Sequence, residues 1–333
     1  MAKRHSFKLI LGLAVGAVFF YLALRSVDVD QMLAALAKAD VRWIAASAAI
    51  MMLAHLLRAI RWRYLLAPVR TVDTGSLLSA LLVGYAANTF MPAHLGEFLR
   101  AFVIAKKKSL SASAVFASIV VERVVDVISL IVVMAVVIIV HPFPAWVETS
   151  GALMLAGALL LLGTLIAGKR YEARAAALVR RLTRPLPAAV AGRIASLTAN
   201  FLAGIRPLKS AGHYTAAAIL SIAIWLCYAG MNFTCLEAFG MVTSHRLPWY
   251  VGLVVLVFTT LSVVIPSTPG YVGTYHYLCQ LSLVMFGVSA SEALSFAVIA
   301  HLVNVVPVSL AGLICANVEG VAIYRSAEEV RRS

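Results

Sequence analysis

Five charged side chains lie within or beside long apolar runs of this sequence: Glu97, Arg100, Glu122, Arg123 and Asp126. A charge at bilayer depth costs about 2.5–3.5 kcal/mol on insertion scales, and such charges usually mark a binding site or a transport pathway. Arginine binds phosphate oxygens through two parallel hydrogen bonds, whereas carboxylates bind amines or hold arginines in place. The pattern therefore predicts a polar cavity that binds a charged, phosphate-bearing headgroup.

Helical spacing indicates how these five side chains could pair. Residues three or four apart lie on one face of a helix, so Glu97 is expected beside Arg100, and Asp126 beside Arg123 and Glu122. Two interpretations stay open at this point. Arg100 and Arg123 could bind a lipid phosphate, with Glu97 and Glu122 binding an amine or holding the arginines, or the ion pairs could only fix helix packing.

The headgroup-binding candidates also include Arg58, His301 and Asn304. His55, Arg58 and Arg61 form a basic stripe at the inner end of the second apolar run. Arg58 is included among the headgroup-binding candidates, although we expect the long side chains of Arg58 and Arg61 to reach toward the inner membrane interface. His301 and Asn304, from a late apolar run, complete the headgroup-binding set.

Enzyme and metal signatures are weak. The sequence has no GxSxG, HExxH or Walker loop, so no catalytic residue is predicted. Glu122, Asp126 and His301 could be imagined as metal ligands, but nothing specifies the remaining ligands, and we predict neither a metal nor a cofactor. The four cysteines lie in apolar runs without CxxC spacing and are interpreted as small apolar fillers.

The elements that must position these residues are membrane-spanning helices. Hydrophobic residues make up 62% of the 333 residues and charged residues 13%, with a mean hydropathy of +0.94. Soluble domains carry about 25% charged residues, and lipid-exposed backbone must satisfy its hydrogen bonds internally. We therefore predict an all-α integral membrane protein with about eight transmembrane helices, the first a retained anchor rather than a signal peptide. The expected spans are 7–24, 43–57, 75–91, 111–140, 150–167, 213–237, 249–265 and 291–316.

Charge predicts the orientation of these spans. The segment 168–210 carries nine Lys/Arg and one Glu, and basic residues also dominate 1–8, 58–73 and 106–108. The alternate segments between spans carry no excess of basic residues. Because basic loops stay in the cytoplasm, both termini are expected there, in a multi-pass protein of the cell inner membrane. The net charge of +14 is thus read as a topology signal, not as nucleic-acid binding.

The linker 168–210 is expected to be cytoplasmic, basic and amphipathic. Its stretch 170–184, "RYEARAAALVRRLTR", resembles a basic helix that lies on the inner leaflet. Neither this linker nor any other segment reads as a separate domain, so residues 1–333 are treated as a single polytopic membrane domain.

Two stretches of the chain resemble each other. "SASAVFASIVVERVVD" ends at Asp126 and "SASEALSFAVIAHLVN" ends at Asn304, which places Arg123 opposite His301. Upstream, "FMPAHLG" resembles "VIPSTPG". With the charge-based topology the two copies, about 75–140 and 249–318, run in opposite directions, and inverted repeats with interrupted helices are typical of transporters.

Proline and glycine are expected to break a helix inside the membrane in each copy, which gives two re-entrant or broken helices. The alternative is that the same residues form ordinary turns at the membrane surface. The expected helix-break residues are Pro92, Gly96, Pro266, Pro269, Gly270 and Gly273.

These motifs carry a resemblance to a known family. "NTFMPAHLGEFLRAFVI", "ASIVVERVVDVISL" and "IPSTPGYVGTYHYL" resemble the lysylphosphatidylglycerol synthase transmembrane-region family over about residues 7–318. That family includes the flippase half of MprF-type proteins, and stand-alone members found with hopanoid biosynthesis and with lipid-linked glycosyl transfer. MprF-type proteins carry a soluble aminoacyl-transfer domain after the membrane region, whereas this chain ends at Ser333, so the resemblance implies the membrane part alone.

The resemblance implies a non-enzymatic flippase or transporter-like protein whose partners are the membrane and a phospholipid or other lipid. Two alternatives stay open: an accessory protein for the enzymes of lipid, hopanoid or lipid-linked glycan biosynthesis, and a membrane-embedded lipid-modifying enzyme. The substrate, the energy source and the oligomeric state are not implied.

Overall fold

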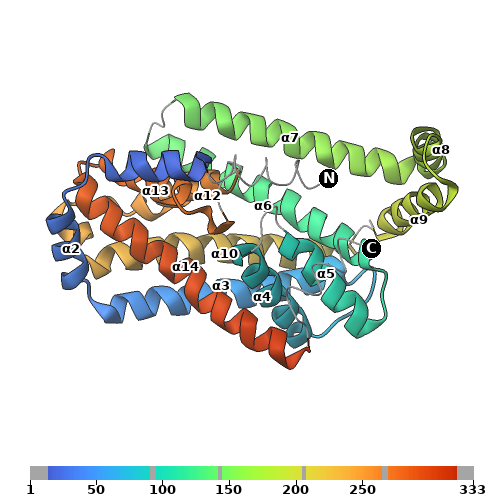
Figure 1. Cartoon of the computed structure of the whole chain (residues 1–333), viewed down its shortest axis with the longest axis horizontal. Coiled ribbons are helices and arrows are strands. Elements are labelled where there is room, and N and C mark those ends of the chain that lie inside the picture. Colours follow the sequence, from blue (N-terminus) through green and yellow to red (C-terminus); the bar gives the residue numbers. More distant parts are fainter. Residues whose placement is uncertain (1–13, 91–94, 142–144, 205–207, 265–268, 321–333) are drawn as a thin grey trace.

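The computed structural model describes residues 14–90, 95–141, 145–204, 208–264 and 269–320, and in these residues all regular structure is helical (Figure 1). A helical segment, Ala14–Leu24, comes first. The elements that follow are α2 (Val29–Lys38), α3 (Val41–Leu66), α4 (Thr74–Phe90), α5 (Leu95–Lys108), α6 (Ala112–Val140), α7 (Ala145–Arg170), α8 (Glu172–Thr183), α9 (Ala188–Gly204), α10 (Ala211–Ala238), α11 (Met241–Ser244), α12 (Val251–Val264), the 3-10 turn η1 (Pro269–Tyr271), α13 (Thr274–Val284) and α14 (Ala290–Val318).

Five of these helices are long and apolar enough to cross a membrane: α3, α6, α7, α10 and α14. The all-helical, multi-span prediction is confirmed to this extent. The other three expected spans correspond to shorter helices: Ala14–Leu24, α4 and α12. A count of eight spans therefore stays a prediction.

The second span is longer than expected. α3 continues to Leu66, whereas the hydropathy pattern placed its end near 57. Leu65 and Leu66 are buried, so helix packing, rather than hydropathy alone, sets where α3 ends. This extension places Arg58 and Arg61 inside the helix bundle.

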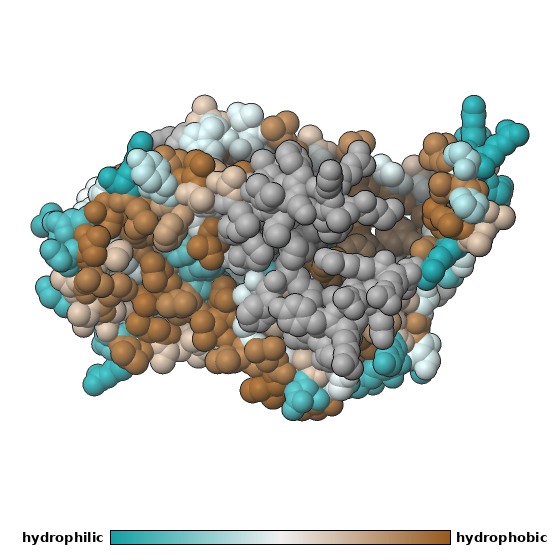
Figure 2. Space-filling model, viewed as in Figure 1, coloured by the Kyte–Doolittle hydropathy of each residue, from teal (hydrophilic) through white to brown (hydrophobic). Residues whose placement is uncertain are grey.

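The bundle has two distinct ends, which α14 connects. At one end His245 lies 3.3 Å from Glu292. At the other end Lys107 donates a hydrogen bond of 2.6 Å to Glu319, which directly follows α14. In Figure 1 the first end carries α2, and α8 and α9 project from the second. In Figure 2, among the residues coloured by hydropathy, hydrophilic residues gather mainly toward these two ends. Hydrophobic residues cover much of the coloured surface between them.

Two helical hairpins enter the bundle from these opposite ends. α4 packs on α5, and Lys108 at the end of α5 lies 2.7 Å from Asp73, which precedes α4. The hydrogen bonds from the Lys108 ammonium and the Ser76 amide hold the pKa of Asp73 below its usual range. α12 packs on α13 in the same way, with the rings of Tyr250 and Phe286 6.4 Å apart at its outer end.

The inner tips of the two hairpins meet. A Cβ added to Gly270 would lie 3.7 Å from the Thr89 carbonyl oxygen. Gly270 and Gly273 both have positive φ angles, +71° and +94°, which glycine adopts without a Cβ clash. The break residues Gly96, Pro269, Gly270 and Gly273 thus lie at helix starts or turns. Pro92 and Pro266 lie outside the described residues.

Candidate headgroup site: a buried arginine–carboxylate cluster

Three helices bring seven charged side chains together in the interior of the bundle. We call this set the arginine cluster. α3 contributes two arginines, α5 a glutamate and an arginine, and α6 a glutamate, an arginine and an aspartate: Arg58, Arg61, Glu97, Arg100, Glu122, Arg123 and Asp126.

Glu122 lies at the centre of the cluster. Its side chain has no solvent-accessible surface, and its carboxylate accepts hydrogen bonds from Arg58 (2.7 Å), Arg100 (2.5 Å) and Arg123 (2.8 Å). The Arg61 guanidinium lies 3.7 Å away. A buried carboxylate is tolerated only when charged partners replace its hydration, and four arginines do so here.

Asp126 lies one helical turn further along α6. It accepts hydrogen bonds from Arg61 (2.5 Å) and Arg58 (2.7 Å), and Arg123 lies 3.3 Å away. Arg58 therefore bridges Glu122 and Asp126, so the charges on α3 and α6 form one network rather than separate pairs.

Neutral side chains complete the enclosure of the arginines. α10 supplies Tyr228, whose hydroxyl accepts from Arg58 at 3.0 Å, and Ser221, whose hydroxyl accepts from Arg61 at 2.9 Å. The Arg100 guanidinium carbon lies 4.6 Å from the ring centre of Trp62. A cation held over an indole face is stabilised by the ring quadrupole.

The cluster carries more positive than negative charge. Four arginines face three carboxylates, which gives a formal charge of +1. The Nε atoms of all four arginines are buried and form no hydrogen bond within the described part of the chain, and neither does the Oε2 atom of Glu97. Buried donors of this kind normally have partners, and for the Arg100 Nε the Glu97 Oε2 atom lies 3.6 Å away.

Arg123 is the accessible arginine of the cluster. Its side chain keeps 38% of its surface exposed, against 6% or less for Arg58, Arg61 and Arg100. Glu97 is its nearest carboxylate outside α6, at 3.8 Å. Arg123 is therefore the arginine through which the cluster borders the surroundings of the bundle.

A crevice too narrow to hold a water molecule adjoins the buried side of the cluster between α4 and α5. Glu97, Arg100, Tyr85 and Asn88 contribute to its wall. Asn88 also accepts a hydrogen bond of 2.7 Å from the Gly96 amide, which fixes the start of α5 and thus the position of Glu97.

His301 and Asn304 lie in a different environment. His301 hydrogen-bonds to the Gly270 carbonyl at 2.8 Å and stacks on Tyr275, and Asn304 donates to the Tyr275 hydroxyl at 3.2 Å. Among the described residues neither forms a hydrogen bond or ion pair with the arginine cluster. These two side chains instead fix the turn at the tip of the α12–α13 hairpin.

A metal centre has no support in the described residues, where no group of three or more His, Cys, Asp or Glu side chains could hold a metal ion. The four cysteines, two of them buried, are free thiols.

The local pairings expected from helical spacing are confirmed. Arg100 lies 3.6 Å from Glu97, and Arg123 lies 3.3 Å from Asp126. The expectation that Arg58 and Arg61 reach the membrane interface is wrong, because both are buried against the α6 carboxylates.

Sequence reasoning missed the neutral partners of the cluster. Trp62 follows Arg61 directly, but nothing in the sequence relates it to Arg100. Tyr228 and Ser221 lie seven residues apart on α10 and thus on one helix face, but no pattern in the sequence relates that face to the arginines.

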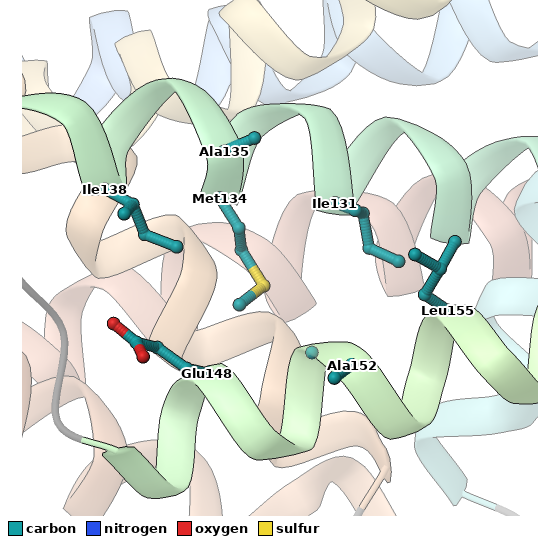
Figure 3. A pocket seen from close by; sticks show the side chains of 8 residues that line it. Ile131, Met134, Ala135, Ile138, Glu148, Ala152 and Leu155 are labelled. Atoms are coloured by element: carbon teal, nitrogen blue, oxygen red, sulfur yellow. The ribbon is translucent and has the colours of Figure 1, made fainter.

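A second hollow of the surface lies between α6 and α7 (Figure 3). Apolar side chains line it, among them Ile131, Met134 and Leu155, and Glu148 is its one charged lining residue. It is separate from the arginine cluster, and its lining suits an acyl chain rather than a headgroup.

Comparisons with known proteins place the chain in a family. The family model described as the lysylphosphatidylglycerol synthase TM region matches residues 9–312. A glycosyltransferase of Haloferax volcanii, AglD, is 28% identical over 132 residues, which are 39% of this chain and 21% of that protein. The chain thus corresponds to about a fifth of that relative's length. No solved structure matches it. With five helices long enough to span a bilayer and a family match over most of its length, this multi-pass membrane protein belongs to the lysylphosphatidylglycerol synthase transmembrane-region family.

Proposed function

We propose that this protein binds the headgroup of a phosphate-bearing lipid at the arginine cluster and moves it between the leaflets of the membrane. The observation that carries the proposal is the excess positive charge of a cluster that lies inside the bundle. Structural ion pairs alone need only neutrality, whereas a phosphate would balance the extra charge and accept a hydrogen bond from the Arg123 Nε, which forms none within the described residues.

The arginines have different roles in this proposal. Arg123 binds the phosphate, because it is the exposed member of the cluster. Arg58, Arg61 and Arg100 hold Glu122 and Asp126, and they add positive potential from positions buried deeper than Arg123. Glu97, at the edge of the cluster, either orients Arg123 or binds an amine of the headgroup.

The two hairpins support a transport role. We interpret α4–α5 and α12–α13 as re-entrant segments of an inverted repeat, since they come from opposite ends and meet at Thr89 and Gly270. Transporters of this kind bind substrate where broken helices meet, near the bilayer midplane. Rocking of one hairpin against the other would open the arginine cluster to each leaflet in turn.

A second candidate function is an accessory or enzymatic role in lipid-linked glycan biosynthesis. It is favoured by the similarity to a protein named a glycosyltransferase. In this role the cluster would present a lipid phosphate to a partner enzyme or reaction without moving it across the membrane.

Replacement of Arg123 tests the proposal. In Arg123→Ala, Glu122 and Asp126 keep Arg58, Arg61 and Arg100, so the remaining cluster is neutral and the fold is retained. Transfer of a labelled phospholipid between leaflets in proteoliposomes should fall by about tenfold or more, the effect of losing one bidentate charged contact of roughly 1.5–3 kcal/mol. Arg123→Lys keeps the charge but loses the planar fork, so transfer should also be impaired.

The matched control is Arg42→Ala, because Arg42 is an exposed arginine on the first turn of α3, far along that helix from Arg58. A well-folded Arg123→Ala protein with normal transfer would remove Arg123 from the site. Lipid binding that depends on Arg123, with no transfer by the wild type, would favour the accessory or enzymatic role.

A further inference from the structure

The α8–α9 arm, Glu172–Gly204, projects beyond the other helices at the end of the bundle opposite α2 (Figure 1). The arm is strongly basic. Glu172 is its single acidic residue and pairs with Lys169 at 2.5 Å. The arginines of the arm form no ion pair among the described residues, and they are Arg174, Arg180, Arg181, Arg184 and Arg193.

Apolar side chains interleave with these arginines on the exposed face of α8. Leu178 and Leu182, one turn apart, keep 57% and 68% of their surface exposed. Arg174 lies one turn before Leu178 and places its guanidinium 5.2 Å from the ring centre of Tyr171. Arg174 and Arg181 thus flank the exposed stripe of Tyr171, Leu178 and Leu182, and a basic stripe beside an apolar one is typical of a helix that lies in the bilayer interface.

The arm is held firmly at its far end. A Cβ on Gly204 would clash with the backbone of Ala114, so the end of α9 lies directly on the start of α6. Phe201 also lies 6.4 Å from Phe116, between ring centres. At its near end the apolar helix α7 leads directly into α8. Both attachments keep the arm beside the membrane surface in which α7 ends.

We propose that the α8–α9 arm is a docking surface for anionic lipid headgroups, with the arginines on the headgroups and Tyr171, Leu178 and Leu182 among the upper acyl carbons. Charge complementarity identifies the occupant, because unpaired arginines attract acidic lipids at short range. The exposed leucines distinguish a bilayer from a nucleic acid or an acidic soluble protein, since Leu178 and Leu182 lie exposed beside Arg174 and Arg181.

Amide hydrogen exchange of the whole protein in lipid nanodiscs tests this surface. The probes are discs of phosphatidylcholine alone and discs in which about a third of the lipid is phosphatidylglycerol, whose negative charge attracts polybasic segments. Peptides of 172–186 should exchange about tenfold more slowly in the anionic discs, and high salt should abolish the difference by screening. The variant Arg174→Gln/Arg180→Gln/Arg181→Gln should lose the slowing.

A matched control removes the same number of exposed cations at the opposite end: Arg25→Gln/Lys38→Gln/Arg42→Gln. It should retain the slowing in 172–186. Equal exchange of the wild type in both lipids would overturn the proposal, as would slowing that survives in the Arg174/Arg180/Arg181 variant. Protection that appears only with two protein copies per disc, whatever the lipid, would assign the face to a second copy of this chain and overturn it too.

Discussion

Glu122 is the side chain on which the charges of three helices converge. It is fully buried and accepts hydrogen bonds from arginines on α3, α5 and α6. Glu122→Gln keeps the shape but removes the charge, which leaves the buried arginines with two carboxylates. Breaking a buried ion network by removing one partner costs about 3–5 kcal/mol, so we expect a lower thermal midpoint and less folded protein in detergent.

The control for that variant is Glu148→Gln, which removes an exposed carboxylate at the start of α7. Its thermal midpoint should match that of the wild type. A Glu122→Gln protein as stable as the wild type would mean that the arginines do not depend on this carboxylate, and the cluster would then not hold α3, α5 and α6 together.

The contrast between Glu122 and its local pairs shows what the sequence could reveal at this scale. The pairing of Arg123 with Asp126 follows from helix geometry and is visible in the spacing. The bond from Arg58 to Glu122 joins residues 64 positions apart and depends on how α3 packs on α6. No local pattern encodes that contact, and therefore the buried role of Arg58 and Arg61 was not predicted.

At the scale of elements, the α4–α5 hairpin depends on a close approach of two glycines. A Cβ on Gly96 would overlap the Gly84 carbonyl oxygen and the Asn88 side chain. Gly96→Ala must therefore separate α4 from α5, and overpacking of this kind costs about 1–3 kcal/mol. Because Glu97 and Arg100 move with α5, we expect Gly96→Ala to lower both the thermal midpoint and lipid transfer.

Gly157→Ala is the matched control, because a Cβ at Gly157 on α7 meets no atom within 4 Å. Alanine also has the higher helix propensity, so this variant should be as stable as the wild type or slightly more stable. If Gly96→Ala behaves like Gly157→Ala, the hairpin tolerates separation and the close approach is not required.

Helices were easier to predict than their ends. The apolar runs predicted α6, α7, α10 and α14 well, because a continuous apolar stretch has one way to satisfy its backbone in lipid. The short amphipathic helix α8 also lies where its charge pattern indicated. The end of α3 was predicted too early, because Arg58 and Arg61 look like a boundary until their partners on α6 are known.

For the whole molecule, the two ends of the bundle differ in charge, and this difference supports the orientation predicted from the sequence. The end from which α8 and α9 project also carries Lys107, Lys108 and the end of α14, and it is rich in basic residues. The α2 end has the more balanced charge. The burial of Arg58 and Arg61 in the core removes only two basic residues from this count, and the 168–210 segment still supplies the largest share, nine Lys/Arg.

This orientation predicts that the two ends of α7 face different compartments. Trp146 lies on the first turn of α7 and Arg180 lies on α8, just beyond its other end, and both side chains are exposed. Since basic segments stay in the cytoplasm, Arg180→Cys should be protected in intact cells from a membrane-impermeant maleimide, and Trp146→Cys should react. After the membrane is permeabilised, both should react.

The native protein supplies the background for that measurement. Its cysteines lie on the helices α10, α13 and α14, where they are buried or partly buried, so labelling of the wild type should be low. The two positions lie at opposite ends of α7 and therefore control for each other. If α7 crosses the membrane, one position must react in intact cells and the other must be protected. Labelling of position 180 from outside, with position 146 protected, would show that the protein has the opposite orientation. The α8–α9 arm would then lie at the outer leaflet. Equal labelling of both positions in intact cells would mean that α7 does not cross the membrane. With 26 residues, most of them apolar, this helix is long enough to do so.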